Sequence, residues 1–182
     1  MEYHLNLPIE DSDVLKLRAG DIVYFSGVMY TARDAAHKRL VELIRNGKEL
    51  PMDVRNSAIY YVGPTPAKPG RAIGSAGPTS SYRMDPYSED LMKIGLKVMI
   101  GKGPRSKEYK DALIRNGAVY LSAIGGAAAL ISETIKKCDM IAYPDLGAEA
   151  IHRLEIEEFM AIVTYDSVGG DLFETEIKKY KK

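Results

Sequence analysis

The sequence predicts an α/β fold in which a mixed sheet core is flanked by helices, in a β/β/α arrangement. Apolar, β-rich runs alternate with amphipathic helical runs in the middle of the chain, which is the pattern of strands covered by helices. Further strands are expected at both ends, outside this alternating region. No convincing boundary divides the 182 residues, which suffice for one sizeable core, so we expect residues 1–182 to form a single domain.

Strands are expected where apolar, β-branched and aromatic residues cluster between turn residues. The run at 21–30 (DIVYFSGVMY) is apolar and β-rich, and it predicts a buried strand. The short strands expected at 2–8 and 12–17 rest on the alternation of apolar and polar side chains. The other expected strands are residues 57–62, 72–76, 98–100, 118–123, 139–143, 159–165 and 172–173.

Helices are expected where apolar side chains recur at helical spacing between a capping residue and a glycine. Thr31 is the expected N-cap of the first helix, and Gly47 is its expected stop. The second helix is expected to begin at Asp85-Pro86, because proline is tolerated in a first turn. The expected helices are residues 31–46, a helix from Asp85, 106–116 and 125–137, with a loop at 63–70, a turn at 167–170 and a frayed end at 178–182.

Composition argues against two classes of partner. Basic and acidic residues both number 25, so the chain lacks the basic excess of a general nucleic-acid-binding protein. No apolar run reaches the roughly 18 residues of a membrane span, and the first residues lack the basic and apolar parts of a signal peptide. We therefore expect a cytoplasmic protein with no nucleic-acid or membrane partner.

Cysteine and histidine content bears on metal binding. The single cysteine, Cys138, cannot form an intrachain disulfide or build a cysteine-based metal or iron–sulfur site. It is expected to be a small, partly buried residue after a helix. The three histidines are far apart and none has metal-ligand spacing. We expect no metal ligand in this chain.

The segment from Gly74 to Asp85 (GSAGPTSSYRMD) is the most informative part of the sequence. Small residues lead into three hydroxyls, beginning with Thr79, and Arg83 follows just before the expected helix. Glycine lets the backbone approach a ligand, and hydroxyls with backbone N–H groups before a helix suit an anion. Arginine binds a carboxylate or phosphate with two parallel hydrogen bonds. The segment therefore predicts an anion-binding loop with a hydroxyl available for proton transfer.

Two further cations follow expected strands. Arg33 comes after the strand that ends at Tyr30, and Lys102 comes after the strand that ends at Ile100. Because ligands collect at the carboxyl ends of strands in open α/β sheets, these cations and the Thr79–Arg83 loop could converge on a small dicarboxylate. The alternatives are solvated surface charges and ordinary turn residues.

Four segments together resemble the β subunit, or C-terminal domain, of class I fumarate hydratases and L(+)-tartrate dehydratases. They are GDIVYFSGVMYTARDAAHKRL (20–40), YYVGPTPAKPGRAIGSAGPTSSYRMD (60–85), IGKG (100–103) and LSAIGGAAAL (121–130). The resemblance runs from about Leu5 to Phe173. It implies a swivelling β/β/α domain and a hydro-lyase that reversibly hydrates fumarate to malate, or dehydrates a related hydroxy diacid such as tartrate.

The resemblance also implies roles for individual residues. Arg33, Arg83 and Lys102 would bind the substrate carboxylates, and Thr79 would be the catalytic base. The 4Fe-4S cluster of the family would be held by a separate α subunit, in an α2β2 assembly with a β–β contact. The single cysteine of this chain agrees with a cluster supplied by a partner. Tyr82 stands where a small residue is expected in the family.

Two other functions remain open at this stage. One is a non-catalytic dicarboxylate-binding or assembly module. The other is a nucleotide- or phosphate-binding protein built on the glycine loops, such as Gly101-Lys102-Gly103. The full phosphate-loop pattern is absent from the sequence, which counts against the nucleotide-binding alternative.

Overall fold

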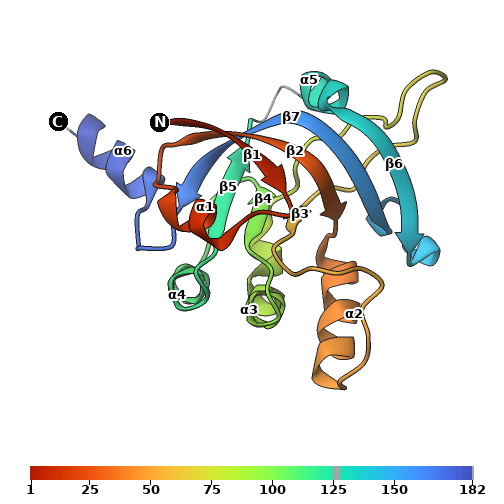
Figure 1. The fold of residues 1–182 in the computed structure, drawn as a ribbon, viewed down its shortest axis with the longest axis horizontal. Coiled ribbons are helices and arrows are strands. Elements are labelled where there is room, and N and C mark those ends of the chain that lie inside the picture. The colour runs from red at the N-terminus through yellow and green to blue at the C-terminus, as the bar shows by residue number, and fades with distance from the viewer. Residues whose placement is uncertain (125–127, 182) are drawn as a thin grey trace.

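The computed structural model describes residues 1–124 and 128–181. The strands in this part are β1 (Glu2–Leu7), β2 (Ile22–Thr31), β3 (Ala58–Tyr60), β4 (Val98–Gly101), β5 (Val119–Ala123), β6 (Ile135–Ala142) and β7 (Ile151–Tyr165). They form one sheet in the order β1-β2-β3-β4-β5-β7-β6 (Figure 1). Neighbouring strands from β1 to β5 run parallel, whereas β7 is antiparallel to β2, β5 and β6. The predicted mixed sheet is confirmed.

The long strand β7 closes the sheet into a ring. It pairs with β5 near its carboxyl end and with β2 along its middle. Because β2 also pairs with β3 through Tyr30 and Thr31, strands β2, β3, β4, β5 and β7 surround one apolar core. Tyr60 and Ile100 belong to this inner core. Because side chains alternate along a strand, the residues directly next to them in β3 and β4 face outward.

Three helices cover the outer face of the ring. They are α2 (Asp34–Arg45), α3 (Asp85–Lys93) and α4 (Lys107–Asn116), and they lie side by side below the sheet in Figure 1. Their apolar sides meet the outward strand residues Ile59, Met99 and Tyr120 in a second buried cluster. This layer places the amino ends of all three helices near the carboxyl ends of the strands that precede them.

The remaining elements lie at the periphery. They are the helices α1 (Asp11–Lys16), α5 (Ala128–Thr134) and α6 (Leu172–Tyr180) and the 3-10 segments η1 (Ser81–Met84) and η2 (Pro144–Glu149). Helix α5 lies on the opposite side of the sheet from α2, α3 and α4, and α6 projects at the C-terminal end (Figure 1). No helix of the described residues is both long enough and apolar enough to span a bilayer.

Three expected strands are wrong: residues 12–17, 72–76 and 172–173, the last of which begin helix α6. Residues 12–17 belong largely to helix α1, because Val14 and Leu17 are buried at helical spacing and the alternation is incidental. Residues 72–76 form no strand. This segment bonds back to Thr65, whose N–H donates to the Ser75 carbonyl at 3.1 Å, and so it closes a loop on itself.

The other differences concern element ends. Thr31 is the last residue of β2, where its hydroxyl accepts the His152 N–H at 3.0 Å, so Arg33 is the N-cap of α2. Residues 135–137, expected in a helix, begin β6, and Cys138 therefore lies in a strand. Strand β7 begins at Ile151, eight residues before the expected start at Phe159. Residues 172–173, expected as a strand, begin α6, which includes Lys178 and Lys179.

Candidate active site

The carboxyl ends of β2, β3 and β4 bring the predicted cations and the Thr79 loop to one edge of the sheet. Arg33 follows β2 directly and caps α2. A backbone hydrogen bond positions Thr79 just beyond β3, since the Thr79 N–H donates to the Tyr61 carbonyl at 2.8 Å. Lys102 follows β4 without a gap. The backbones of Arg33, Thr79 and Lys102 therefore lie at the ends of adjacent parallel strands.

The Thr79–Arg83 loop and Lys102 are held together by their backbones. The Ser81 N–H donates to the Lys102 carbonyl at 3.1 Å, and the Lys102 N–H donates to Ser81 Oγ at 2.8 Å. Ser80 and Lys102 also form a parallel bridge. The loop was expected to follow a strand at 72–76. It is instead positioned by the end of β3 and by the turn after β4.

The side chains of Arg83 and Lys102 are exposed. The nearby carboxylate of Asp85 pairs with Arg105 instead. Within residues 1–124 and 128–181, no carboxylate forms an ion pair with Arg83 or Lys102. Both cations are therefore open to an anionic ligand. Tyr82, which stands between Thr79 and Arg83, is 61% exposed, so its ring is not part of the core.

Arg33 lies between two carboxylates that sequence reasoning did not identify. Its Nε is 3.6 Å from Glu149 Oε1 and 3.9 Å from Asp34 Oδ1. These three buried atoms have no hydrogen-bond partner among the described residues. A Cβ at position 63 would lie 3.1 Å from Arg33 Nη1, so Gly63 leaves room for the guanidinium. The two acids form ion pairs with Arg33 at Nε without hydrogen-bonding to it.

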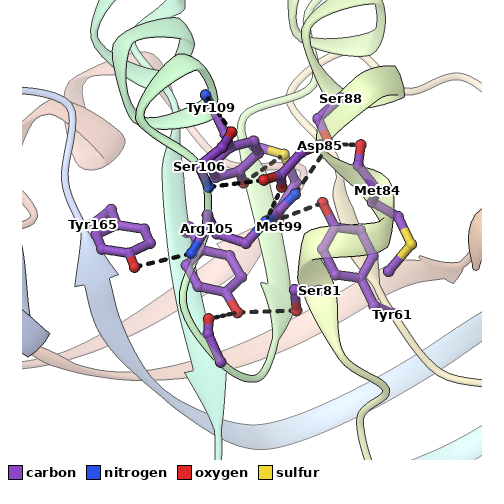
Figure 2. A network of polar contacts seen from close by, with 12 residues as sticks. Tyr61, Ser81, Met84, Asp85, Ser88, Met99, Arg105, Ser106, Tyr109 and Tyr165 are labelled. Carbon is purple, nitrogen blue, oxygen red and sulfur yellow. Dashed lines mark hydrogen bonds and ion pairs between the residues drawn. The ribbon is translucent and has the colours of Figure 1, made fainter.

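A buried cation, Arg105, lies near the starts of α3 and α4 (Figure 2). The Arg105 side chain is fully buried, and its Nε donates to Asp85 Oδ1. The second oxygen of Asp85 accepts the Ser106 N–H at 2.8 Å. The guanidinium lies 3.4 Å from the ring centroid of Tyr109 and 5.2 Å from that of Tyr61. This ion pair ties the start of α3 to the start of α4, beside the loops that carry Arg83 and Lys102.

His37 supports the backbone of Arg33 from inside the core. Its ring is fully buried, and Nδ1 donates to the Arg33 carbonyl at 2.8 Å, since a carbonyl only accepts. Its Nε2 has no hydrogen-bond partner among the described residues. Desolvation lowers the pKa of His37 from 6.5 to about 4, so the ring is neutral at pH 7.

We expect the free energy of unfolding to fall as the pH drops from 6.5 toward 4. In this window the unfolded chain protonates His37 and the folded chain does not, so stability present above pH 6.5 is lost. The loss is on the order of 3 kcal/mol once pH 4 is reached. Urea denaturation at pH 7 and at pH 4.5 measures it. The His37→Gln variant should lose this part of the pH dependence, and an unchanged dependence would contradict the assignment.

Metal-binding side chains do not cluster in the part of the chain that the structure describes. Among residues 1–124 and 128–181, no three His, Cys, Asp or Glu side chains gather in a way that could hold a metal ion. Cys138 is half-buried in β6, and burial raises the pKa of its thiol, so it remains protonated at pH 7. Gly125 and Gly126, at the start of the helix expected at 125–137, lie outside the described residues.

Sequence reasoning missed the residues that support the site rather than form it. Glu149, Asp85 and Arg105 act through contacts between segments far apart in the chain. Composition contained a weak signal, because each of the 12 tyrosines carries a hydroxyl that needs a hydrogen-bond partner when it is buried. The short glycine-flanked turn at Lys102, with Arg105 just after it, was the other signal.

Comparison with known proteins confirms the resemblance. The chain matches the family described as "Fumarase C-terminus" over residues 1–176. It is 40% identical to the protein named "Putative L(+)-tartrate dehydratase subunit beta" of Methanocaldococcus jannaschii, over 100% of this chain and 96% of that protein. It is 42% identical to "Fumarate hydratase class I, anaerobic" of Escherichia coli and 40% identical to "Fumarate hydratase 2" of Leishmania major, in both cases over 85% of this chain.

The matched region covers 28% of each of these two fumarate hydratases, so the chain spans less than a third of their length. It spans nearly all of the tartrate dehydratase subunit. The match over residues 1–176 and the identity over the full length together show that this chain belongs to the fumarase C-terminus family.

Proposed function

We propose that this chain is the β-type subunit of a hydro-lyase that reversibly hydrates fumarate to malate or dehydrates a related hydroxy diacid such as tartrate. The observation that carries the proposal is the grouping of Arg33, Lys102 and the Thr79–Arg83 loop at the ends of β2, β3 and β4. A diacid needs two separated cationic contacts, and this edge provides three cations on independent segments. We further propose that residues 1–182 form one swivelling β/β/α domain.

Each residue has a distinct part in the proposed reaction. Arg33 and Arg83 bind the two carboxylates with paired hydrogen bonds, and Lys102 adds a point charge. Thr79 handles the proton at the carbon that gains or loses it. A threonine hydroxyl is a weak base, so it acts only where the surrounding cations favour its alkoxide or through a proton relay. Fixing the diacid against the hydroxyl contributes to the rate through orientation.

The cluster of the proposed enzyme belongs to its partner. This chain has one cysteine, which does not fit the ligand set of a 4Fe-4S cluster. We therefore propose that a cysteine-bearing α subunit holds the cluster, in an α2β2 assembly with a β–β contact. The cluster would supply Lewis-acid chemistry from the α side. The steps assigned to this chain are substrate binding and proton handling.

Reconstitution tests the proposal directly. The isolated chain should be inactive, and the chain combined anaerobically with a cluster-loaded α-type subunit should interconvert fumarate and malate or dehydrate tartrate. The same pair carrying Thr79→Val, which replaces the hydroxyl by a methyl group, should lose turnover. If the wild-type pair converts none of the three diacids, the proposal fails. Calorimetry with malate and with ATP would then separate a dicarboxylate-binding module from a nucleotide-binding protein.

A further inference from the structure

Ser81 links the Thr79–Arg83 loop to Lys102 through hydrogen bonds. It lies two residues after Thr79 and two residues before Arg83. Its side chain is fully buried, and its Oγ accepts the Lys102 N–H at 2.8 Å. Its own N–H donates to the Lys102 carbonyl at 3.1 Å. Ser81 and Lys102 therefore exchange two hydrogen bonds, and a shift of Ser81 would move the substrate-binding loop and the lysine together.

The space for this hydroxyl is provided by the neighbouring strand. A Cβ on Gly101 would lie 1.9 Å from Ser81 Oγ and 2.7 Å from Tyr61 Cδ2. The hydroxyl thus occupies the place where any other residue at position 101 would put its side chain. An uncharged polar group buried among aromatic rings is costly unless it is hydrogen-bonded. The site keeps this hydroxyl buried and hydrogen-bonded.

Tyr120 is hydrogen-bonded to the same hydroxyl. Its phenolic oxygen is 2.9 Å from Ser81 Oγ and 3.0 Å from the Gly103 carbonyl oxygen, and it is hydrogen-bonded to both. Tyr120 therefore fixes the residue after Lys102 as well as the residue that receives the Lys102 N–H. Burial raises the pKa of Tyr120, so the hydroxyl keeps its proton. The bonds reach both sides of Lys102 and the centre of the Thr79–Arg83 loop.

We infer that Ser81 and Tyr120 are positioning residues of the active site, whose hydroxyls keep Lys102 in register with Thr79 and Arg83. The inference rests on the proposed function, because register between these residues matters only when they bind one substrate. Neither hydroxyl is assigned contact with the diacid. Their effect is transmitted through the backbone of Lys102 and of the loop.

The first test measures position without substrate. Amide hydrogen exchange of the isolated chain, followed by NMR, should show the Lys102 N–H exchanging about tenfold faster in Ser81→Ala than in the wild type, because the variant lacks its acceptor. The amide of Met99 in β4 is the internal reference and should keep its protection. Unchanged exchange at Lys102 would overturn the inference whether or not the chain is part of an enzyme.

The second test uses the reconstituted α–β pair. Tyr120→Phe and Ser81→Ala should each lower kcat/KM for the diacid about tenfold, and the double variant should lose less than the two losses combined, since both changes break the Tyr120–Ser81 bond. Tyr109→Phe is the matched control. It is an equally buried tyrosine whose hydroxyl bonds Met99 Sδ at 3.2 Å, so its kcat/KM should stay at the wild-type value.

The outcomes of the two tests are separable. If the wild-type pair converts no diacid, the proposed function fails, while the exchange at Lys102 still decides whether Ser81 positions that residue. If the wild-type pair is active and Tyr120→Phe is as active as Tyr109→Phe, the inference is overturned and the proposed function stands. Strictly additive losses in the double variant would also overturn it, because they would mean two independent roles.

Discussion

The Arg83→Ala variant is expected to lose at least about 10²-fold in kcat/KM for the diacid while unfolding at the wild-type temperature. Two charge-assisted hydrogen bonds to a carboxylate contribute about 1.5–3 kcal/mol each, and alanine provides neither. The Arg83 side chain is exposed in η1 and supports no other described residue through an ion pair. Its removal should therefore change the free energy of unfolding by no more than about 0.5 kcal/mol. Steady-state kinetics of the reconstituted pair and thermal unfolding measure the two effects.

Two variants control this expectation. Arg55→Ala removes an equally exposed arginine before the start of β3, at the opposite end of the strand from the site, and should leave kcat/KM unchanged. Arg83→Lys keeps the charge but loses the paired geometry, so its activity should lie between those of the wild type and Arg83→Ala. If Arg83→Ala turns over at the wild-type rate, Arg83 does not bind the substrate.

The parts of the fold that could be predicted from sequence are those with local signals. The run at 21–30 and the short strands before Gly101 and at 118–123 are dense in β-branched and apolar residues, and all form strands. Helix α4 ends at Gly117, as expected for the helix at 106–116, and Ser106 is its N-cap. These elements set the backbone positions of Arg33 and Lys102, so it could be predicted that both candidate residues follow the ends of strands.

The elements that were missed lacked such a signal or carried two. Residues 172–173 look like a return strand after the turn at 167–170. Asp171, however, accepts the Glu174 N–H at 3.0 Å, and this capping bond starts α6. Residues 135–137 are polar for a strand. They become one only because β7 provides a partner edge for them, through pairs such as Lys137 with Glu155.

The supporting residues of the site could not be predicted for a related reason. Arg105 and Asp85 are 20 residues apart, and Arg33 and Glu149 come from opposite ends of the domain. A single sequence records each charge but not its partner. The residues that would contact the substrate stood out by motif, whereas those that hold them in place are identified only once β7 and η2 are in position.

The Gly101→Ala variant is expected to be strongly destabilised by a single added methyl group. The new Cβ would fall 1.9 Å from Ser81 Oγ and 2.7 Å from Tyr61 Cδ2, and both of those side chains are buried. Overpacking of this kind costs about 3 kcal/mol at the upper end of its usual range. For a chain of this length that lowers the melting temperature by roughly 6–12 °C. Thermal unfolding of the isolated chain measures this shift without a partner or substrate.

The contacts of Gly101 also predict which second change restores stability. Ser81→Ala in the same chain removes the contact at 1.9 Å but leaves Tyr61 Cδ2 at 2.7 Å and the Cβ of residue 81 at 3.2 Å. The double variant should therefore recover part of the lost melting temperature, and not all of it. Gly77→Ala is the matched control, because among the described residues its Cβ would meet only Ala128 Cβ at 3.5 Å, an ordinary contact. A double variant no more stable than Gly101→Ala would mean that the clash with Tyr61, and not the Ser81 hydroxyl, is what requires glycine at the end of β4.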